Sequence, residues 1–331
     1  MPPSERLGAL RASKRTLVMG VLNVTTDSFS DGGLWLDPDR ARDHARAMIR
    51  QGAAIIDVGA ESTRPGAQRV PEPVERERIV RTLRAVRGFA RSAGVFLSVD
   101  TTRASVAAAA LEEGADILND VSGGRMDARM APLVASHGCL YIVQHWRGWL
   151  GRNADPASGP STRPAAHAGV GAGDSDYPHG VVEDTLAELS AQVRAVLACG
   201  VDSAQIVVDP GLGFSKPGPA FNYPILAQLE RFRSLGYPVL LGASRKGFLS
   251  RTLQEGRNRA ARPDADHPGS GRSSAERPGN GRLDTATAAF SLLAAQKGAW
   301  AVRVHDVQAT CDALAVLEEE RKYRRDAGEG D

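Results

Sequence analysis

The sequence predicts an α/β fold, a single (β/α)8 barrel in which parallel strands alternate with helices. Short apolar runs rich in β-branched residues alternate with longer amphipathic stretches along the 331 residues, which is the pattern of repeated βα units. Each short run ends in a polar residue, and in a barrel such ends meet at one face. No G-x-G-x-x-G follows the first run, so the dinucleotide fingerprint of an open doubly wound sheet is missing.

Eight runs have the nearly continuous apolar character of strands that are covered on both faces. They are residues 16–23, 54–59, 95–100, 116–119, 140–145, 205–209, 238–242 and 299–305. A weak internal repeat supports this count, because Gly52-Ala-Ala-Ile-Ile-Asp57, Gly114-Ala-Asp-Ile-Leu-Asn119 and Gly298-Ala-Trp-Ala-Val-Arg303 follow the same order. In each, a Gly-Ala turn ends a helix, a strand follows, and a polar residue stands at its far end.

Helices are expected between these strands. Asp37 and Pro38 form a good N-cap and first-turn pair, and the apolar residues from Ala41 onward recur on one face. Residues 183–197 and 310–320 have similar spacing.

Two stretches lie outside this rhythm. Residues 149–180 and 256–282 are rich in Gly, Pro, Ser, Arg and Asp and lack apolar periodicity. We expect both to be long, mobile surface loops, the second an insertion between two halves of a helical region. One barrel domain would then span residues 15–324, with polar, mobile tails at 1–14 and 325–331.

Composition argues against several kinds of partner. Charged residues make up 24% of the chain and the formal net charge is +2, so neither a nucleic-acid partner nor a membrane partner is expected. Cys139, Cys199 and Cys311 are far apart and odd in number, which is typical of reduced thiols. The polar N-terminus has no apolar core of signal-peptide length, and no apolar run approaches the ~18 residues of a membrane span. We therefore expect a soluble, cytoplasmic protein.

Polar side chains stand at the C-terminal end of all eight predicted strands. Any one of them is more often a cap or a satisfied buried group than a functional residue. Eight at the same end are hard to explain as caps, and together they predict a site. They are Asn23, Asp57, Asp100, Asn119, His145, Asp209, Ser244 with Arg245 and Lys246, and Arg303 with His305.

Part of this site suits an anion. The loops at 23–33 and 61–67 are polar and contain glycine, and the second carries Arg64. They could also be two ordinary turns. Arg303 and His305 lie two residues apart on the last strand, so their side chains share one face. A guanidinium fork beside a ring donor fits a diphosphate, and helix N-termini after the last two strands would add backbone donors.

Another part suits a flat heterocycle. The turn Asp209-Pro-Gly-Leu-Gly-Phe214 follows the sixth strand, and a buried carboxylate there needs donors. A 2-amino-4-oxo ring offers adjacent N–H groups that match the two carboxylate oxygens. Lys246 complements the ring carbonyl, and Asn119 can both donate and accept at the same edge. His145 lacks neighbours at metal-ligand spacing, so we interpret it as structural.

Seven ordered motifs stand at the predicted strands. They are Met19-Gly-Val-Leu-Asn-Val-Thr-Thr-Asp-Ser-Phe-Ser-Asp-Gly-Gly33, Ile56-Asp-Val-Gly-Ala-Glu-Ser-Thr-Arg-Pro-Gly66, Ser98-Val-Asp-Thr101, Asn119-Asp-Val-Ser122, Asp209-Pro-Gly-Leu-Gly-Phe214, Gly242-Ala-Ser-Arg-Lys246 and Arg303-Val-His-Asp306. Together they resemble the dihydropteroate synthase family over residues 17–320, and His145-Trp-Arg147 is similar to its actinobacterial branch.

The resemblance implies condensation of 6-hydroxymethyl-7,8-dihydropterin pyrophosphate with p-aminobenzoate, giving 7,8-dihydropteroate and pyrophosphate in folate biosynthesis. It implies a Mg²⁺-dependent, homodimeric transferase in a family of sulfonamide targets. The family's catalytic positions correspond to Asn23, Arg64, Arg303 and His305, with Asn23 also holding Mg²⁺. Its pterin-binding positions correspond to Asp100, Asn119, Gln144, Asp209, Gly213, Phe214 and Lys246, and its p-aminobenzoate pocket to Thr63, Phe29 and Ser244.

Three positions depart from the family pattern. Thr26 stands where proline is commonest, Ala60 where a glycine is usual, and Gln144 where a methionine usually packs on the pterin. Two other functions stay open: a non-catalytic pterin-binding paralogue and a pterin-dependent methyltransferase. A paralogue that binds pterin without catalysis would be expected to have lost Arg303 or His305, and a methyltransferase would not need this pair. Both residues are present.

Overall fold

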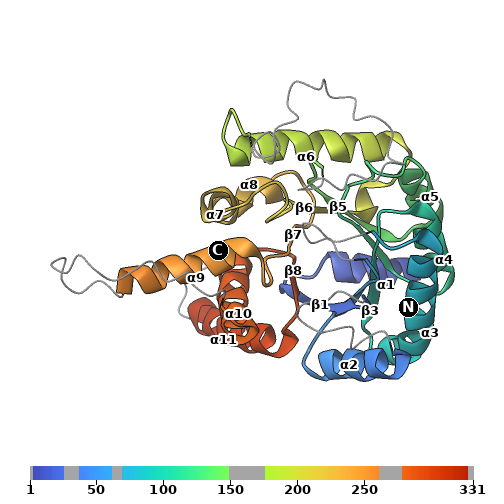
Figure 1. Ribbon diagram of the computed structural model, residues 1–331, viewed down its shortest axis with the longest axis horizontal. Helices are drawn as coiled ribbons and strands as arrows, with labels where there is room; N and C mark the ends of the chain where they lie inside the picture. The colour runs from blue at the N-terminus through green and yellow to red at the C-terminus, as the bar shows by residue number, and fades with distance from the viewer. Residues whose placement is uncertain (1–2, 26–36, 62–68, 149–175, 261–277, 327–331) are drawn as a thin grey trace.

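The strands of the computed structural model form one closed ring (Figure 1), in a structure that describes residues 3–25, 37–61, 69–148, 176–260 and 278–326. All strand pairs are parallel, and the order around the sheet is β6-β5-β4-β3-β2-β1-β8-β7. A bridge between Val208 and Val239 closes the ring where β6 meets β7. The strands are β1 (Leu17–Asn23), β2 (Ile55–Gly59), β3 (Phe96–Asp100), β4 (Ile117–Asp120), β5 (Leu140–Gln144), β6 (Ile206–Asp209), β7 (Leu240–Leu241) and β8 (Ala301–Val304). The (β/α)8 barrel predicted from the sequence is confirmed, with every strand inside or within one residue of its predicted range.

Helices surround the ring of strands (Figure 1). They are α1 (Pro3–Arg11), α2 (Pro38–Arg50), α3 (Glu72–Ser92), α4 (Ala104–Glu112), α5 (Met130–His137), α6 (Val181–Ala198), α7 (Pro219–Ala227), α8 (Leu229–Arg233), α9 (Gly247–Ala260), α10 (Asn280–Gln296) and α11 (Val307–Asp326), with a 3-10 turn at Ser203–Gln205. The predicted cap holds, because the Asp37 side chain accepts from the backbone N–H of Asp39 at the start of α2. Among the described helices, none is long and apolar enough to cross a membrane.

Strand register brings the predicted polar residues to one level. Asn23 lies opposite Gly59, Gly59 opposite Asp100, and Asp100 opposite Asn119. Since parallel strands in register end together, the strands β1 to β4 bring Asn23, Gly59, Asp100 and Asn119 to one rim of the barrel.

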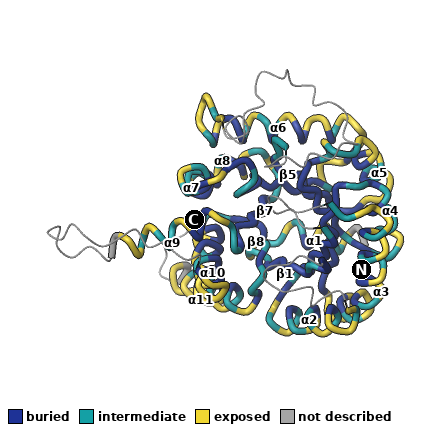
Figure 2. The backbone as a smooth tube through the Cα atoms, viewed as in Figure 1, coloured by how far each residue is buried: buried dark blue, intermediate teal, exposed yellow. Residues whose placement is uncertain are grey.

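Two apolar layers hold the barrel together. In Figure 2 the labelled strands are mostly buried, whereas the surrounding helices alternate between buried and exposed residues. The larger layer lies between the strands and the helices, and includes the α2 residues Ala41, Ala45 and Met48. The smaller layer fills the amino-terminal half of the barrel interior, where Met19 and Ile117 point inward from neighbouring parts of the ring. The polar end therefore stands on a packed floor rather than over a pore.

Helix α1 differs from the tail expected over residues 1–14. Leu7 and Leu10 are buried in the inner apolar layer, and the Trp300 indole N–H donates to the Leu10 carbonyl at 3.0 Å. The Arg6 guanidinium lies 4.9 Å from the centroid of the Phe96 ring. Two leucines in a polar segment are a weak sequence signal, and the end of the barrel supplies the surface that buries them.

The two expected long loops fall largely outside the described residues, at 149–175 and 261–277. The flanks of the second are helical, since α9 continues to Ala260 and α10 begins at Asn280. The insertion is thus shorter than the low-complexity composition suggests. Helix α11 likewise runs to Asp326, two residues into the expected C-terminal tail.

Candidate active site at the carboxyl ends of the strands

Arg303 on β8 joins three strands at the polar end of the barrel. Its Nε donates to Asp57 Oδ2 of β2 at 2.6 Å, and a terminal nitrogen donates to Asp100 Oδ2 of β3 at 2.8 Å. Asn119 Nδ2 of β4 donates to the same Asp57 oxygen at 3.1 Å. Asp57 is fully buried, whereas Arg303 keeps 22% of its side chain exposed. One face of this cluster is therefore accessible from the open end of the barrel.

The cluster is electrostatically strained. Burial raises the pKa of Asp100 to about 7; Arg303 acts against that rise and the nearby Asp57 carboxylate adds to it. Burial disfavours the charge on Arg303, but Asp57 and Asp100 more than offset this, so its pKa is raised. One cation is shared by two carboxylates, and a bound anion would compete with them for Arg303.

A second group of site residues lies at the turn after β6. Asp209 is buried, and its Oδ1 accepts from the backbone N–H of Gly211 at 2.7 Å. Lys246 crosses this turn, with its Nζ 4.6 Å from the centroid of the Phe214 ring. Gly213 has a φ of +76°, and a Cβ there would lie 2.9 Å from Lys246 Cδ. Only glycine meets both demands, which explains this position of the motif.

Asp209 and Lys246 stabilise each other's charged forms. Burial raises the pKa of the Asp209 carboxyl, and the Lys246 ammonium is the main group that opposes this. Burial lowers the pKa of Lys246 to about 8, with Asp209 acting in the other direction. The turn after β6 therefore carries a carboxylate and an ammonium that favour each other's charged form, with the Lys246 ammonium donating to the Leu212 carbonyl.

The loops after β7 and β8 meet through Ser244 and His305. Ser244 Oγ lies 2.9 Å from His305 Nδ1 and accepts from the His305 backbone N–H at 3.1 Å. Between Ser244 and Lys246, Arg245 has a φ of +57° and is held by two bonds to Asp284 of α10, at 2.7 and 2.9 Å. A left-handed conformation costs a non-glycine residue on the order of 1–2 kcal/mol. The bidentate bond between Arg245 and the Asp284 carboxylate therefore stabilises a strained loop that positions Ser244 and Lys246.

Comparison with known proteins agrees with this geometry. A family profile described as "Pterin binding enzyme" matches residues 19–305. The dihydropteroate synthase of Mycobacterium leprae (strain TN) is 47% identical over 300 residues, 91% of this chain and 92% of its own. The chain belongs to the dihydropteroate synthase family.

Solved structures of dihydropteroate synthases have the same fold. The enzyme of Yersinia pestis, solved with a sulfonamide drug complex, has a TM-score of 0.75 at 30% identity, over 93% of this chain and 95% of its own. The enzyme of Xanthomonas albilineans, solved with 4-aminobenzoic acid, has a TM-score of 0.73 at 32% identity, over 93% of each chain.

Most site residues predicted for a dihydropteroate synthase lie in three neighbouring groups. The groups are Asp100, Asn119 and Arg303; Asp209, Gly213, Phe214 and Lys246; and Ser244 with His305. Asn23 is half-buried at the end of β1. Thr26, Phe29, Thr63 and Arg64 lie outside the described residues.

The two described departures from the family pattern are both buried. Ala60 is the residue directly after β2, and its side chain is fully buried. Gln144 donates from Nε2 to the Val121 carbonyl at 3.3 Å, so its amide is turned toward the end of β4.

Three functional candidates were missed or given no role by the sequence analysis. Asp57 was expected at a strand end, but the structure places it two residues before the end of β2, and its link to Arg303 emerges only from the fold. Lys216 is fully buried beside His145 Nδ1, at 2.9 Å, and Glu188 of α6 lies 3.0 Å from His145 Nε2. A lysine directly after a glycine-rich turn is the one local signal that could have drawn attention to Lys216.

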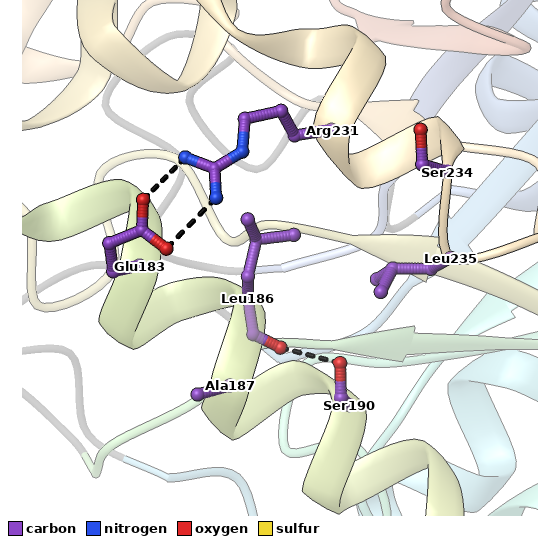
Figure 3. Close-up of a pocket in the computed structure, with 7 residues that line it drawn as sticks. All are labelled: Glu183, Leu186, Ala187, Ser190, Arg231, Ser234 and Leu235. Atoms are coloured by element: carbon purple, nitrogen blue, oxygen red, sulfur yellow. Dashed lines mark hydrogen bonds and ion pairs between the residues drawn. The ribbon is translucent and has the colours of Figure 1, made fainter.

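A surface groove of about 440 Å³ lies between α6 and α8 on the flank of the barrel (Figure 3). Glu183 and Arg231 form an ion pair across it, and its remaining lining comes from Leu186, Ala187, Ser190, Ser234 and Leu235. None of the predicted site residues lines it, and it offers no converging set of polar groups. This groove is therefore separate from the predicted site residues at the strand ends.

Proposed function

We propose that this protein condenses 6-hydroxymethyl-7,8-dihydropterin pyrophosphate with p-aminobenzoate, giving 7,8-dihydropteroate and pyrophosphate. The observation that carries the proposal is the pairing of two groups at one end of the barrel: the Asp209–Lys246 pair and the Arg303 cluster. The first suits a pterin edge and the second suits a diphosphate. Relatives support it, since the X. albilineans synthase was also solved in complex with 7,8-dihydropteroate, at 29% identity and a TM-score of 0.68.

The pterin would lie against Asp209, Asn119 and Lys246. Asp209 uses one oxygen for the Gly211 N–H, so the other is suited to accept from the ring and exocyclic nitrogens of the pterin. The Lys246 ammonium would donate to the ring carbonyl, and Phe214 lines the same slot. Asp100 would complete this edge from β3.

The diphosphate would bind at Arg303 and His305, with Arg64 as a further cation. Arg303 offers a planar fork, which is suited to two phosphate oxygens. In the structure Asp57 and Asp100 fix the orientation of the guanidinium, and the diphosphate would then compete with them for its N–H donors. The Ser244–His305 contact sets the orientation of the imidazole.

The reaction needs charge stabilisation more than proton transfer. The C–N bond forms between the amine nitrogen and the exocyclic methylene, the C–O bond breaks, and pyrophosphate leaves with the electron pair. The electron-rich dihydropterin ring stabilises the positive charge that develops on the methylene. Arg303, His305 and Arg64 would stabilise the departing negative charge, and the amine then loses one proton to water or pyrophosphate.

Asn23 would hold Mg²⁺ together with the diphosphate oxygens. A Cβ on Gly59 would lie 3.2 Å from Asn23 Oδ1, so the glycine leaves room around this oxygen. The described residues contain no group of three or more His, Cys, Asp or Glu side chains placed for a metal. An amide oxygen completed by substrate phosphates fits Mg²⁺, which often binds through few protein ligands. When bound, the ion would neutralise charge on the leaving pyrophosphate.

The aromatic amine would enter between Ser244, Thr63 and Phe29. A neutral aromatic amine is a weak nucleophile and mainly needs to be held in line with the breaking bond. We further infer that sulfonamides, which share the aminophenyl group, bind at this place; the Y. pestis synthase was solved with a sulfonamide drug complex.

The protein is proposed to be a cytoplasmic homodimer. Its free cysteines include an exposed one, Cys199, which fits a reducing compartment. Val316 and Tyr323 on α11 are 70% and 69% exposed, and Leu293 on α10 is 44% exposed, so these helices offer apolar surface for a second copy. Light scattering coupled to gel filtration tests this; a monomer at micromolar concentration would contradict it.

The decisive experiment is a turnover assay with the pterin pyrophosphate, p-aminobenzoate and Mg²⁺, in which dihydropteroate and pyrophosphate are both quantified. We expect the two products in equal amounts. Pterin binding without turnover would instead indicate a non-catalytic paralogue, and methyl transfer from a methylated pterin would indicate a methyltransferase.

A further inference from the structure

Lys216 is a buried lysine for which the proposed reaction has no role. It lies seven residues after Asp209 on the same turn, and its side chain is fully inaccessible. Uncompensated burial of an ammonium is costly, so its partners indicate what it does. Its Nζ lies 2.9 Å from His145 Nδ1 and donates to the carbonyls of Gly211 and Phe214, both at 3.3 Å. Two carbonyl groups of the turn after β6 therefore bind the Lys216 ammonium.

The partners of Lys216 continue into a closed chain of contacts. Burial, together with the charge on Lys216, lowers the pKa of His145 to about 3, so the ring is neutral. Its Nδ1 therefore accepts from the ammonium and its Nε2–H donates to Glu188 at 3.0 Å. Glu188 also binds Arg147 in a bidentate pair, at 2.8 and 2.6 Å.

The chain returns to the turn through Tyr177. The Arg147 guanidinium lies 3.9 Å from the Tyr177 ring centroid, and the Tyr177 hydroxyl donates to the Ser215 carbonyl at 3.2 Å. Ser215 has a φ of +53° with a buried side chain, which is a strained conformation for a non-glycine residue. A strained conformation of this kind persists only where surrounding contacts hold the backbone in place. Here Tyr177 binds the Ser215 carbonyl and Lys216 binds the Phe214 carbonyl.

We propose that Lys216 is a positioning residue for pterin recognition: its buried ammonium, seated on His145 and on two turn carbonyls, holds the turn after β6 so that Asp209 receives the pterin as a carboxylate. This rests on the proposed function. Lys246 lies against the same turn, so two ammonium groups act on Asp209. Lys216 does not touch the pterin and acts through Asp209.

The electrostatics of the turn agree with this geometry. Burial lowers the pKa of Lys216 to about 7, and Asp209 opposes that fall. In return, Lys216 lowers the pKa of Asp209, after Lys246 and the Gly211 N–H, and Arg303 acts in the same direction from β8. The other charged groups that act on Lys216 are Arg147, Lys246 and Glu188.

Lys216→Met, which removes the charge and keeps most of the side-chain length, tests the proposal. We expect the variant to fold, as judged by circular dichroism and its melting temperature. Its affinity for 6-hydroxymethylpterin, measured by calorimetry at pH 7, should fall about tenfold. The acid limb of pterin affinity should move to higher pH by about one pH unit, because a cation that favours ionised Asp209 is gone. Affinity for inorganic pyrophosphate with Mg²⁺ should stay unchanged.

Lys297→Met is the matched control, because Lys297 binds only the Ala227 carbonyl in the described structure and lies outside this cluster. Lys216→Gln is the second variant, since it keeps a donor without the charge. An even loss of affinity at all pH values, with the acid limb in place, would mean that Lys216 only supports packing and would overturn the proposal. Failure of both variants to fold would do the same. If the wild type binds no pterin, the proposed function itself fails.

Discussion

Replacing Arg303 with methionine tests whether the cluster at the barrel end is as strained as its contacts imply. Arg303 donates to two carboxylates at 2.6 and 2.8 Å, one fully buried and one 8% exposed. Removing one partner from a buried ion pair typically costs about 3–5 kcal/mol, because an uncompensated charge remains. We expect a loss of unfolding free energy in this range at pH 9, measured by urea denaturation.

The loss should depend on pH in a defined direction. Without Arg303, the pKa of Asp100 rises above its present value of about 7. A carboxyl whose pKa is raised in the folded state destabilises that state progressively as pH rises from the unfolded pKa to the folded pKa, and by a constant amount above the folded pKa. At pH 6 Asp100 is largely protonated in either protein, so a further rise of one unit makes the penalty about 1.4 kcal/mol larger at pH 9 than at pH 6.

Arg84→Met provides the matched control. Arg84 is 63% exposed and pairs with Glu113 on the surface, where solvent screens the ion pair and its loss costs little. Glu113 has a lowered pKa, so this small cost should be equal at pH 6 and pH 9. An Arg303→Met penalty that is below 1 kcal/mol at pH 9, or the same at both pH values, would refute the reasoning.

Three further predictions concern the turn, the fifth strand and the barrel floor. Ser215→Gly should stabilise the protein by about 1 kcal/mol in urea, because glycine adopts the +53° φ without strain and removes a buried hydroxyl that has no hydrogen-bond partner in the described structure; a loss of stability would contradict this. Gln144→Met should keep or improve pterin affinity, and a roughly tenfold loss by calorimetry, about 1.4 kcal/mol, would count against it. Trp300→Phe should cost about 1–2 kcal/mol through the lost bond to the Leu10 carbonyl, and should speed amide exchange in α1; unchanged exchange there would show that the helix is held by its leucines alone.

Local signals were sufficient for much of this protein. Continuous apolar, β-branched runs, some preceded by Gly-Ala turns, located the strands. A strand that is covered on both faces needs apolar residues at nearly every position, so the sequence of the strand itself indicates its burial. The same local reasoning placed Asp100, Asn119 and Asp209 at strand ends, where the structure has them, whereas Lys246 lies in the loop five residues after β7. The position of a residue within a strand or a turn depends on residues that are close to it in the sequence, and for this reason it can be predicted from the sequence alone.

The sequence alone determined the barrel, its strand ends and the family resemblance, whereas only the tertiary structure decided which polar ends bind one another. Arg303 meets Asp57 and Asp100 across 246 and 203 residues of chain, so the pairing depends on ring closure and register. The same closure turns Lys216 inward to His145 and makes the floor that buries Leu10. Such contacts follow from the global geometry of the barrel, which no short pattern of residues encodes.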